Sequence, residues 1–197
     1  MKPIETVYDV KAQQKTLRRR RYGVIEAANG KLVRIRLRPW PKFASLLEAH
    51  WIRAMKSSRH KSDKCRLFYN EPSSHPGFLT LVYVESSLNT SAKTVFATLS
   101  VLDQIAYIKH SNAIIADVSN KRISDRALKH WGWERYMKQE SQRHWIKRFY
   151  GKYPERVTKL LRPNFEKAYH NHLAQGHISP SGINTSRQGT GEDQRVS

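Results

Sequence analysis

The chain has 197 residues, and its 36 Lys and Arg against 16 Asp and Glu give a net charge of +20 at pH 7. A single cysteine excludes an intramolecular disulfide framework. No apolar stretch is long enough to cross a bilayer, and none resembles a signal peptide. We therefore expect a cytoplasmic protein with no membrane partner and with affinity for polyanions, of which nucleic acid is the commonest.

The positive charge is concentrated in two parts of the chain. Residues 1–66 carry 18 Lys and Arg against 5 acids, and residues 121–167 carry 14 against 5. Residues 67–120 carry only 2 against 4. The middle of the chain is therefore expected to form the buried scaffold, with the basic surface contributed by both flanks.

The predicted elements alternate between strands and helices after a flexible basic arm at residues 1–17. Segments 22–27 and 31–37 flank Asn29-Gly30, a turn signal typical of a β-hairpin. Apolar residues at helical spacing predict a helix over 42–56. The remaining elements expected are strands at 65–69 and 77–86, a helix at 90–111 with Thr90 or Ser91 as N-cap, a strand at 113–118, a helix at 122–131, a strand at 143–150 and a helix within 155–173.

This order predicts an α/β (α+β) fold with a single mixed, mostly antiparallel sheet and helices packed on it. One domain is expected over residues 18–173. Residues 174–197 are rich in Gly, Ser, Thr and Gln and predict a disordered tail.

The element order and the stretch ADVSNKRISDRALKHWGWERY resemble the closing half of a GCN5-related N-acetyltransferase (GNAT) domain, over roughly residues 66–150. Asn120, Gly132 and Trp133 match the family's pattern of an Asn after a strand and a Gly-aromatic pair after the next helix. The resemblance implies an acetyltransferase-like fold, acetyl-coenzyme A as cofactor and acyl transfer to an amine. The combination ISDR, GWER and HWIKRFYG is also similar to a signature of uncharacterised bacterial proteins, which implies no chemistry.

The resemblance places the pyrophosphate-binding loop in SSLNTSAK, ahead of the helix at 90–111. Unpaired N–H groups at a helix N-terminus attract anions, although the glycines that allow close backbone approach are missing here. Glu85 is the candidate general base, or alternatively an ordinary carboxylate at a strand end. The candidate cofactor-binding residues are Ser87, Asn89, Thr90, Ser91 and Lys93.

The family's proton donor to the departing thiolate is a tyrosine four residues before the glycine. Leu128 stands at that position in this chain and cannot donate a proton. Tyr136 or Tyr107 would have to replace it. The sequence therefore leaves open whether the protein is an enzyme.

The stretch KLVRIRLRPW alternates Val33, Ile35 and Leu37 with arginines, which in a strand places the arginines roughly 7 Å apart on one face. Such a row suits the phosphates of a nucleic acid, or it is the solvated face of a one-sided sheet. Residues 143–150 interleave cations with aromatics that either stack on bases or fill the core. The candidate phosphate contacts are Arg18, Arg19, Arg20, Arg21, Arg34, Arg36, Arg38, Lys147 and Arg148.

Two functions are therefore carried forward. One is an acetyltransferase-like protein that uses acetyl-coenzyme A, and the alternative is a basic nucleic-acid-binding protein without catalysis. No metal is expected, because the histidines are isolated except His170, His172 and His177, which have no nearby acid or thiol.

Overall fold

The structure is a computed structural model that describes residues 4–41, 62–118, 124–136 and 143–161. These residues belong to one compact unit, Met1–Leu161, and a second unit, Arg162–Ser197, lies outside the described ranges. The helix predicted over 42–56, the Asn120 match, the histidines from 170 to 177 and the predicted domain end at 173 also fall outside them and stay predictions.

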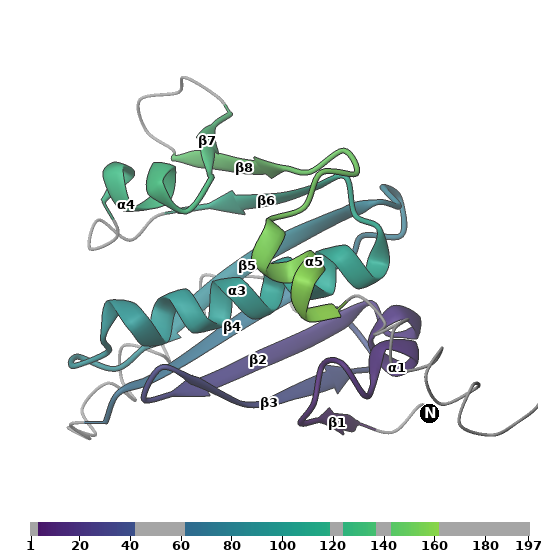
Figure 1. Cartoon of the computed structure of the whole chain (residues 1–197), viewed down its shortest axis with the longest axis horizontal. Helices are drawn as coiled ribbons and strands as arrows, with labels where there is room; N and C mark the ends of the chain where they lie inside the picture. The colour runs from purple at the N-terminus through teal and green to yellow at the C-terminus, as the bar shows by residue number, and fades with distance from the viewer. Residues whose placement is uncertain (1–3, 42–61, 119–123, 137–142, 162–197) are drawn as a thin grey trace, which may run out of the picture. The chain divides into compact units, whose positions relative to one another are not determined.

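One eight-stranded sheet, in the order β1-β3-β2-β4-β5-β6-β8-β7, runs through the described residues (Figure 1). Every neighbouring pair is antiparallel except β5 and β6, which are parallel. The predicted mixed, mostly antiparallel sheet is confirmed. Its strands are β1 (Glu5–Val7), β2 (Tyr22–Ala28), β3 (Lys31–Arg38), β4 (Lys64–Asn70), β5 (Phe78–Ser86), β6 (Ala113–Asp117), β7 (Glu134–Arg135) and β8 (His144–Arg148).

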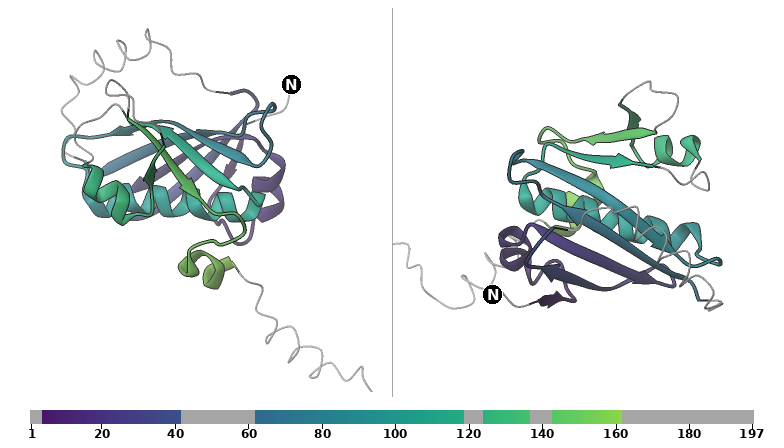
Figure 2. Two further views of the ribbon diagram at one scale, coloured as in Figure 1. Left: turned by 90° about the horizontal axis from the view of Figure 1, so that it is seen from above. Right: turned by 180° about the vertical axis from the view of Figure 1, so that it is seen from behind.

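The helices of the described residues are α1 (Gln14–Arg19), α3 (Ala92–Lys109), α4 (Asp125–His130) and α5 (Glu155–Leu161). All four lie on the same face of the sheet (Figure 2). Helix α3 joins β5 to β6, because two parallel neighbours need a crossover between them. It begins at the N-cap Ser91, whose hydroxyl oxygen accepts a hydrogen bond from the Thr94 N–H, and it ends at His110 in the left-handed conformation.

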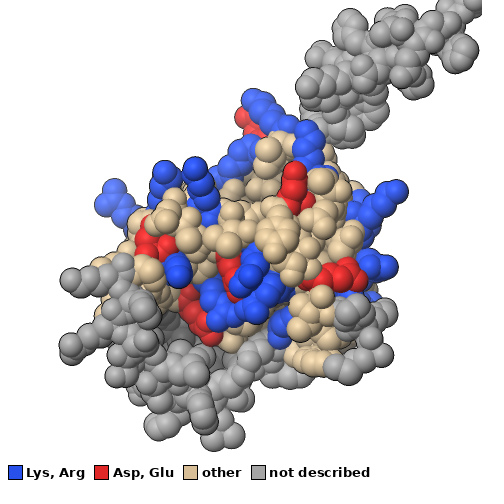
Figure 3. All heavy atoms as spheres, turned by 90° about the horizontal axis from the view of Figure 1, so that it is seen from below, with Lys and Arg blue, Asp and Glu red and all other residues tan. Residues whose placement is uncertain are grey.

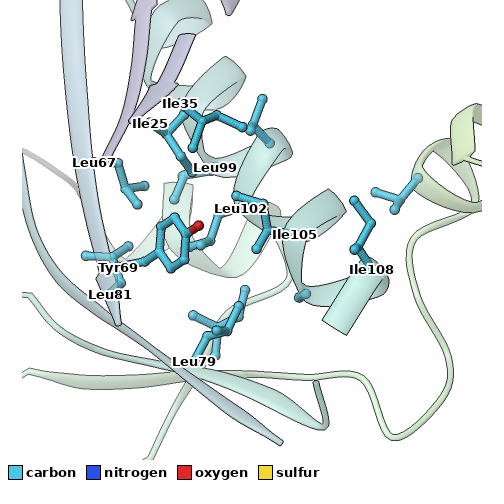
Figure 4. Packing of buried hydrophobic residues seen from close by; sticks show 14 of the residues in the cluster. Ile25, Ile35, Leu67, Tyr69, Leu79, Leu81, Leu99, Leu102, Ile105 and Ile108 are labelled. Atoms are coloured by element: carbon cyan, nitrogen blue, oxygen red, sulfur yellow. The ribbon is translucent and has the colours of Figure 1, made fainter. Parts of the chain in front are cut away.

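The core lies between α3 and the middle of the sheet (Figure 4). Alternate residues of each strand enter it, as the two-residue period of a strand requires. The strand residues Ile25, Ile35, Leu67, Tyr69 and Leu79 are fully buried there, together with Leu102 and Ile105 of α3. Residues in between, including Glu26, Arg34 and Arg66, therefore project from the face opposite α3.

The β2–β3 hairpin forms as predicted, with Asn29 and Gly30 both at positive φ in its turn. A bulge interrupts its register, since Glu26 pairs with Arg34 whereas Ala27 pairs with Leu32. Val33 is the extra residue and is 48% exposed, while Leu32 packs against the core. The predicted alternation therefore holds for Ile35 and Leu37 against Arg34, Arg36 and Arg38, and it is wrong for Val33.

The segment expected to be an arm contains ordered elements. Strand β1 pairs with β3 at one edge of the sheet, and Leu17 of α1 is fully buried. The ordered part of the domain therefore begins before residue 18. A strand of three residues and a helix of six are too short to show a hydrophobic period, which is why the sequence pattern did not reveal them.

Candidate functional site

The parallel strands β5 and β6 are hydrogen-bonded to each other along only the first part of β5. The two strands pair from Phe78 and Ala113 to Leu81 and Ala116. Strand β5 then continues beside β4 to Ser86, past a register shift that leaves Val82 as an extra residue. Residues 82–86 therefore have a strand on one side only within the described chain, and the strands separate toward the end of the sheet where α3 begins (Figure 1).

Half-buried apolar side chains come from the four elements that border this divergence. They are Val84 of β5, Val95 of α3, Val118 after β6 and Trp131 after α4. The ring of Phe96 lies 6.1 Å from that of Trp131. An unpaired strand edge beside apolar side chains can hold an extended chain that carries amide groups and an apolar end.

The N-terminus of α3 already holds an anion from this chain. The carboxylate of Asp63 accepts hydrogen bonds from the Ser91 main-chain N–H (2.9 Å), the Thr94 hydroxyl (2.8 Å) and the Ser91 hydroxyl (2.9 Å). These hydrogen bonds lower the pKa of Asp63, and the bond from the Ser91 main-chain N–H has the largest effect. A ligand phosphate at this helix end would have to displace the Asp63 carboxylate or share its donors.

The predicted cofactor-binding residues are brought together in the loop after β5 and the first turn of α3. The Thr90 hydroxyl donates to the Lys64 carbonyl at 2.7 Å, and the Ser87 hydroxyl donates to the Ser62 carbonyl. These bonds tie the loop to the start of β4. Asn89 and Lys93 are exposed. The loop is thus held by hydrogen bonds within the chain, which no pattern in the sequence indicated.

Glu85 lies in the part of β5 that diverges from β6. Its Oε2 accepts a hydrogen bond from Nη1 of Arg66 at 3.1 Å, and its side chain is 27% exposed. The ion pair holds the carboxylate on the sheet face opposite α3. This placement is compatible with both alternatives, a general base at the divergence and a strand-end carboxylate.

The family's proton-donor position, Leu128, and the two tyrosines that could replace it lie in different surroundings. Leu128 is buried, and its carbonyl accepts from the Trp133 N–H at 3.0 Å, so this position offers only packing. Tyr107 lies in the last turns of α3, about 24 Å along the helix from Ser91. Tyr136 bonds through its main chain to His144 of β8, at the end of the sheet where β6 finishes. Tyr136 is therefore the candidate on the side of the divergence.

The arginine row is organised around one carboxylate. Glu26 lies 2.7 Å from Nε of Arg34, 2.6 Å from Nη2 of Arg36 and 3.2 Å from Nε of Arg66. Burial favours a higher pKa for Glu26, but the hydrogen bond from Arg34 and the charges of Arg36 and Arg66 outweigh it and lower the pKa. Arg38 donates to the Asn70 side chain at 3.3 Å. The row is therefore part of an ionic cluster that spans three strands.

The run Arg18 to Arg21 connects elements of the fold. Nε of Arg18 donates to the Ile108 carbonyl near the end of α3, at 3.0 Å. Arg19 and Arg20 both pair with Glu5 of β1, and Arg21 donates to the Ser73 hydroxyl. Carboxylates lie among the Lys and Arg side chains on the face in Figure 3 as well. Much of the basic charge thus has partners within the chain.

Lys147 is 5% exposed, and its Nζ donates to Asp103 at 2.8 Å. Arg156 donates to the same oxygen of Asp103 at 3.0 Å. Burial lowers the pKa of Lys147, although the charge of Asp103 opposes this. Lys147, one of the predicted phosphate contacts, thus has its side chain in the core and paired with Asp103. Its neighbour Arg148 is 37% exposed and pairs with Glu134.

Two of the aromatics predicted in the last strand, Trp145 and Phe149, are buried in the core, whereas Tyr150 is 64% exposed. Cys65 is also buried, and burial raises the pKa of its thiol.

Among the described residues, no three His, Cys, Asp or Glu side chains gather as metal ligands would. Within the same ranges, no helix is both long and apolar enough to cross a membrane.

Comparison with known proteins does not identify a family for this chain. No family model matches the chain, and no curated protein matches it. Among solved structures, the crystal structure of nourseothricin acetyltransferase is similar at 10% identity and a TM-score of 0.35, over 75% of this chain and 99% of that one. A likeness this distant carries no argument about activity.

Proposed function

We propose that the protein binds acyl-coenzyme A where β5 and β6 diverge and transfers the acyl group to an amine. The observation that supports this is the one-sided edge of β5 over residues 82–86, beside apolar side chains and next to the start of α3. The pantetheine arm of coenzyme A is an extended chain with amide groups, and such chains pair with open strand edges as peptides do.

Bound acyl-coenzyme A supplies an activated thioester carbonyl. In this proposal Glu85 accepts the proton that the attacking amine loses, and the Tyr136 hydroxyl returns a proton to the departing thiolate. Val84, Val95 and Trp131 exclude water from the acyl end. The phosphate end of coenzyme A fits the start of α3 less well. Asp63 already accepts hydrogen bonds from the donors of α3 that the resemblance assigns to the pyrophosphate.

The decisive experiment is calorimetric titration with acetyl-coenzyme A at salt high enough to suppress nonspecific anion binding. Val84→Trp, which puts an indole at the divergence, should weaken binding at least tenfold. Leu160→Trp, on the half-exposed surface of α5, is the matched control and should bind like the unchanged protein. Absence of binding by the unchanged protein, or equal loss in both variants, would refute the proposal.

Catalysis is tested separately by release of the coenzyme A thiol in the presence of small amines. Glu85→Gln should leave acetyl-coenzyme A affinity within about twofold and slow thiol release by roughly 10²- to 10⁴-fold. Tyr136→Phe should give a loss of the same kind. Binding without any thiol release would retain the ligand and reject the enzyme.

The position of the phosphates is tested by Asp63→Asn. If they reach the start of α3, removal of the resident negative charge should tighten acetyl-coenzyme A binding several-fold. The affinity for a pantetheine thioester that lacks phosphates should not change. Equal effects on both ligands would place the phosphates elsewhere.

Nucleic-acid binding remains the alternative, and it rests on the net charge of +20. The ion pairs of Arg19, Arg20, Arg34, Arg36, Lys147 and Arg148 reduce the charge that the predicted contacts offer to a nucleic acid. A steep fall of affinity with salt is the signature to seek.

A further inference from the structure

The sheet face opposite α3 contains a hollow of about 460 Å³ between the ends of β2, β3 and β4. Four cations, Arg34, Arg36, Lys64 and Arg66, line it together with one carboxylate, Glu26. Its remaining lining is small or apolar: Ala27, Ala28, Val33 and Cys65. A volume of this size is typical of sites for small molecules.

The cations in the hollow are incompletely neutralised. Glu26 is shared by three guanidiniums, and the further carboxylate Glu85 reaches Arg66. Counting the described residues alone, four positive charges thus face two negative ones. Clustered like charges repel one another, so the folded protein would gain from a bound anion.

The hollow also has more hydrogen-bond donors than acceptors. Each guanidinium carries five N–H groups, whereas a carboxylate accepts about four bonds. Nε of Arg36 is buried and has no hydrogen-bond partner in the part of the chain that the structure describes. Guanidiniums in this excess match the oxygens of a phosphate, which they bind in pairs.

We propose that this hollow binds a small phosphate monoester, with the phosphate among Arg34, Arg36 and Arg66 and the rest of the ligand over Val33 and Ala28. A compact dianion fits this geometry better than an extended nucleic-acid backbone. The three guanidiniums converge on a single carboxylate from two strands instead of following one strand as a linear row. The inference is independent of acyl-coenzyme A binding, which was placed between β5 and β6.

The test is calorimetric titration with inorganic phosphate and with phenyl phosphate, against chloride at equal ionic strength, at a pH where phosphate is mainly a dianion. Arg36→Gln should weaken binding at least tenfold. Arg148→Gln is the matched control, because Arg148 has nearly the same exposure as Arg36, 37% against 36%, and also pairs with a carboxylate. Circular dichroism verifies that each variant is folded.

Glu26→Gln should change the phosphate affinity in the opposite direction to Arg36→Gln. Removal of the competing carboxylate should tighten phosphate binding several-fold, whereas a cluster with a purely structural role would show no phosphate dependence in either protein. If Glu26→Gln does not fold, Arg34→Gln replaces it and should weaken binding as Arg36→Gln does.

Three results would overturn the proposal. The first is no phosphate binding beyond that of chloride, and the second is an equal loss in Arg36→Gln and Arg148→Gln. The third is binding of a single-stranded oligonucleotide that depends on Arg36 while both phosphate probes fail to bind, which would assign the surface to an extended polyanion.

Discussion

Two ionic clusters in this protein have similar components and different surroundings. On one face of the sheet, Glu26 is shared by three arginines whose side chains are 36–41% exposed. On the other face, Asp103 is shared by Lys147 and Arg156, and both Asp103 and Lys147 are almost completely buried. In each cluster the cations outnumber the central carboxylate. The two clusters differ in burial, and burial determines whether a ligand can reach the charges.

The difference follows from the cost of removing a charge from water. A buried ammonium must keep its carboxylate, because separation leaves an uncompensated charge in the core. A half-exposed guanidinium can exchange one anionic partner for another at little cost. We therefore expect the Asp103 cluster to dominate stability and the Glu26 cluster to respond to anions.

The largest expected effect is that of Asp103→Asn. It leaves the Lys147 ammonium buried without its counter-ion, and the free energy of unfolding should fall by about 3–5 kcal/mol. Urea denaturation followed by circular dichroism measures it. The control is Glu155→Gln, which removes an exposed pair with Lys159 and should cost about 0.5 kcal/mol or less. Similar losses in both variants would contradict the assigned difference in burial.

A smaller loss is expected for Glu26→Gln, whose side chain is 13% exposed. Removal of the carboxylate shared by three guanidiniums should lower the free energy of unfolding by about 2 kcal/mol in chloride buffer. Added phosphate should restore part of this loss if the proposed anion site exists. An equal recovery when chloride is added to the same ionic strength as the phosphate would point to simple screening.

The contribution of Glu26 should also depend on pH in the acid range. Because its pKa is lowered from an ordinary value of 4.5 in the folded protein, its stabilisation is complete above that value. The stabilisation is lost as the pH falls below 4.5 and through the lower pKa of the folded state. The difference between the unchanged protein and Glu26→Gln should therefore shrink over this interval in urea denaturation. A constant difference would mean that Glu26 contributes through packing.

The smallest effect is expected when both members of the buried pair are replaced together. In the double variant Asp103→Leu with Lys147→Met, apolar side chains of similar volume take the place of the pair, and Arg156 is exposed enough to return to water. Such replacements are often close to neutral, so we expect a change of about 1 kcal/mol or less. A loss as large as that of Asp103→Asn would show that the pair contributes more than its mutual neutralisation.

The sequence by itself determined the local elements and the general class of fold. The Asn29-Gly30 turn, the burial of Ile35 and Leu37, an N-cap at Thr90 or Ser91 and the long strand β5 all depend on residues close together in the chain. Turn chemistry, strand alternation and helix capping are local effects and can be predicted from neighbouring residues. The order of these elements then indicated a mixed, mostly antiparallel sheet.

Only the tertiary structure decided the partners of the candidate site residues. Asp63 reaches Thr94 across 31 positions, and Lys147 reaches Asp103 across 44. No local pattern showed that α3 already holds a carboxylate, that Lys147 lies in the core, or that Glu26 gathers arginines from two strands. Ion pairs depend on which strands become neighbours, and strand order is a property of the whole chain.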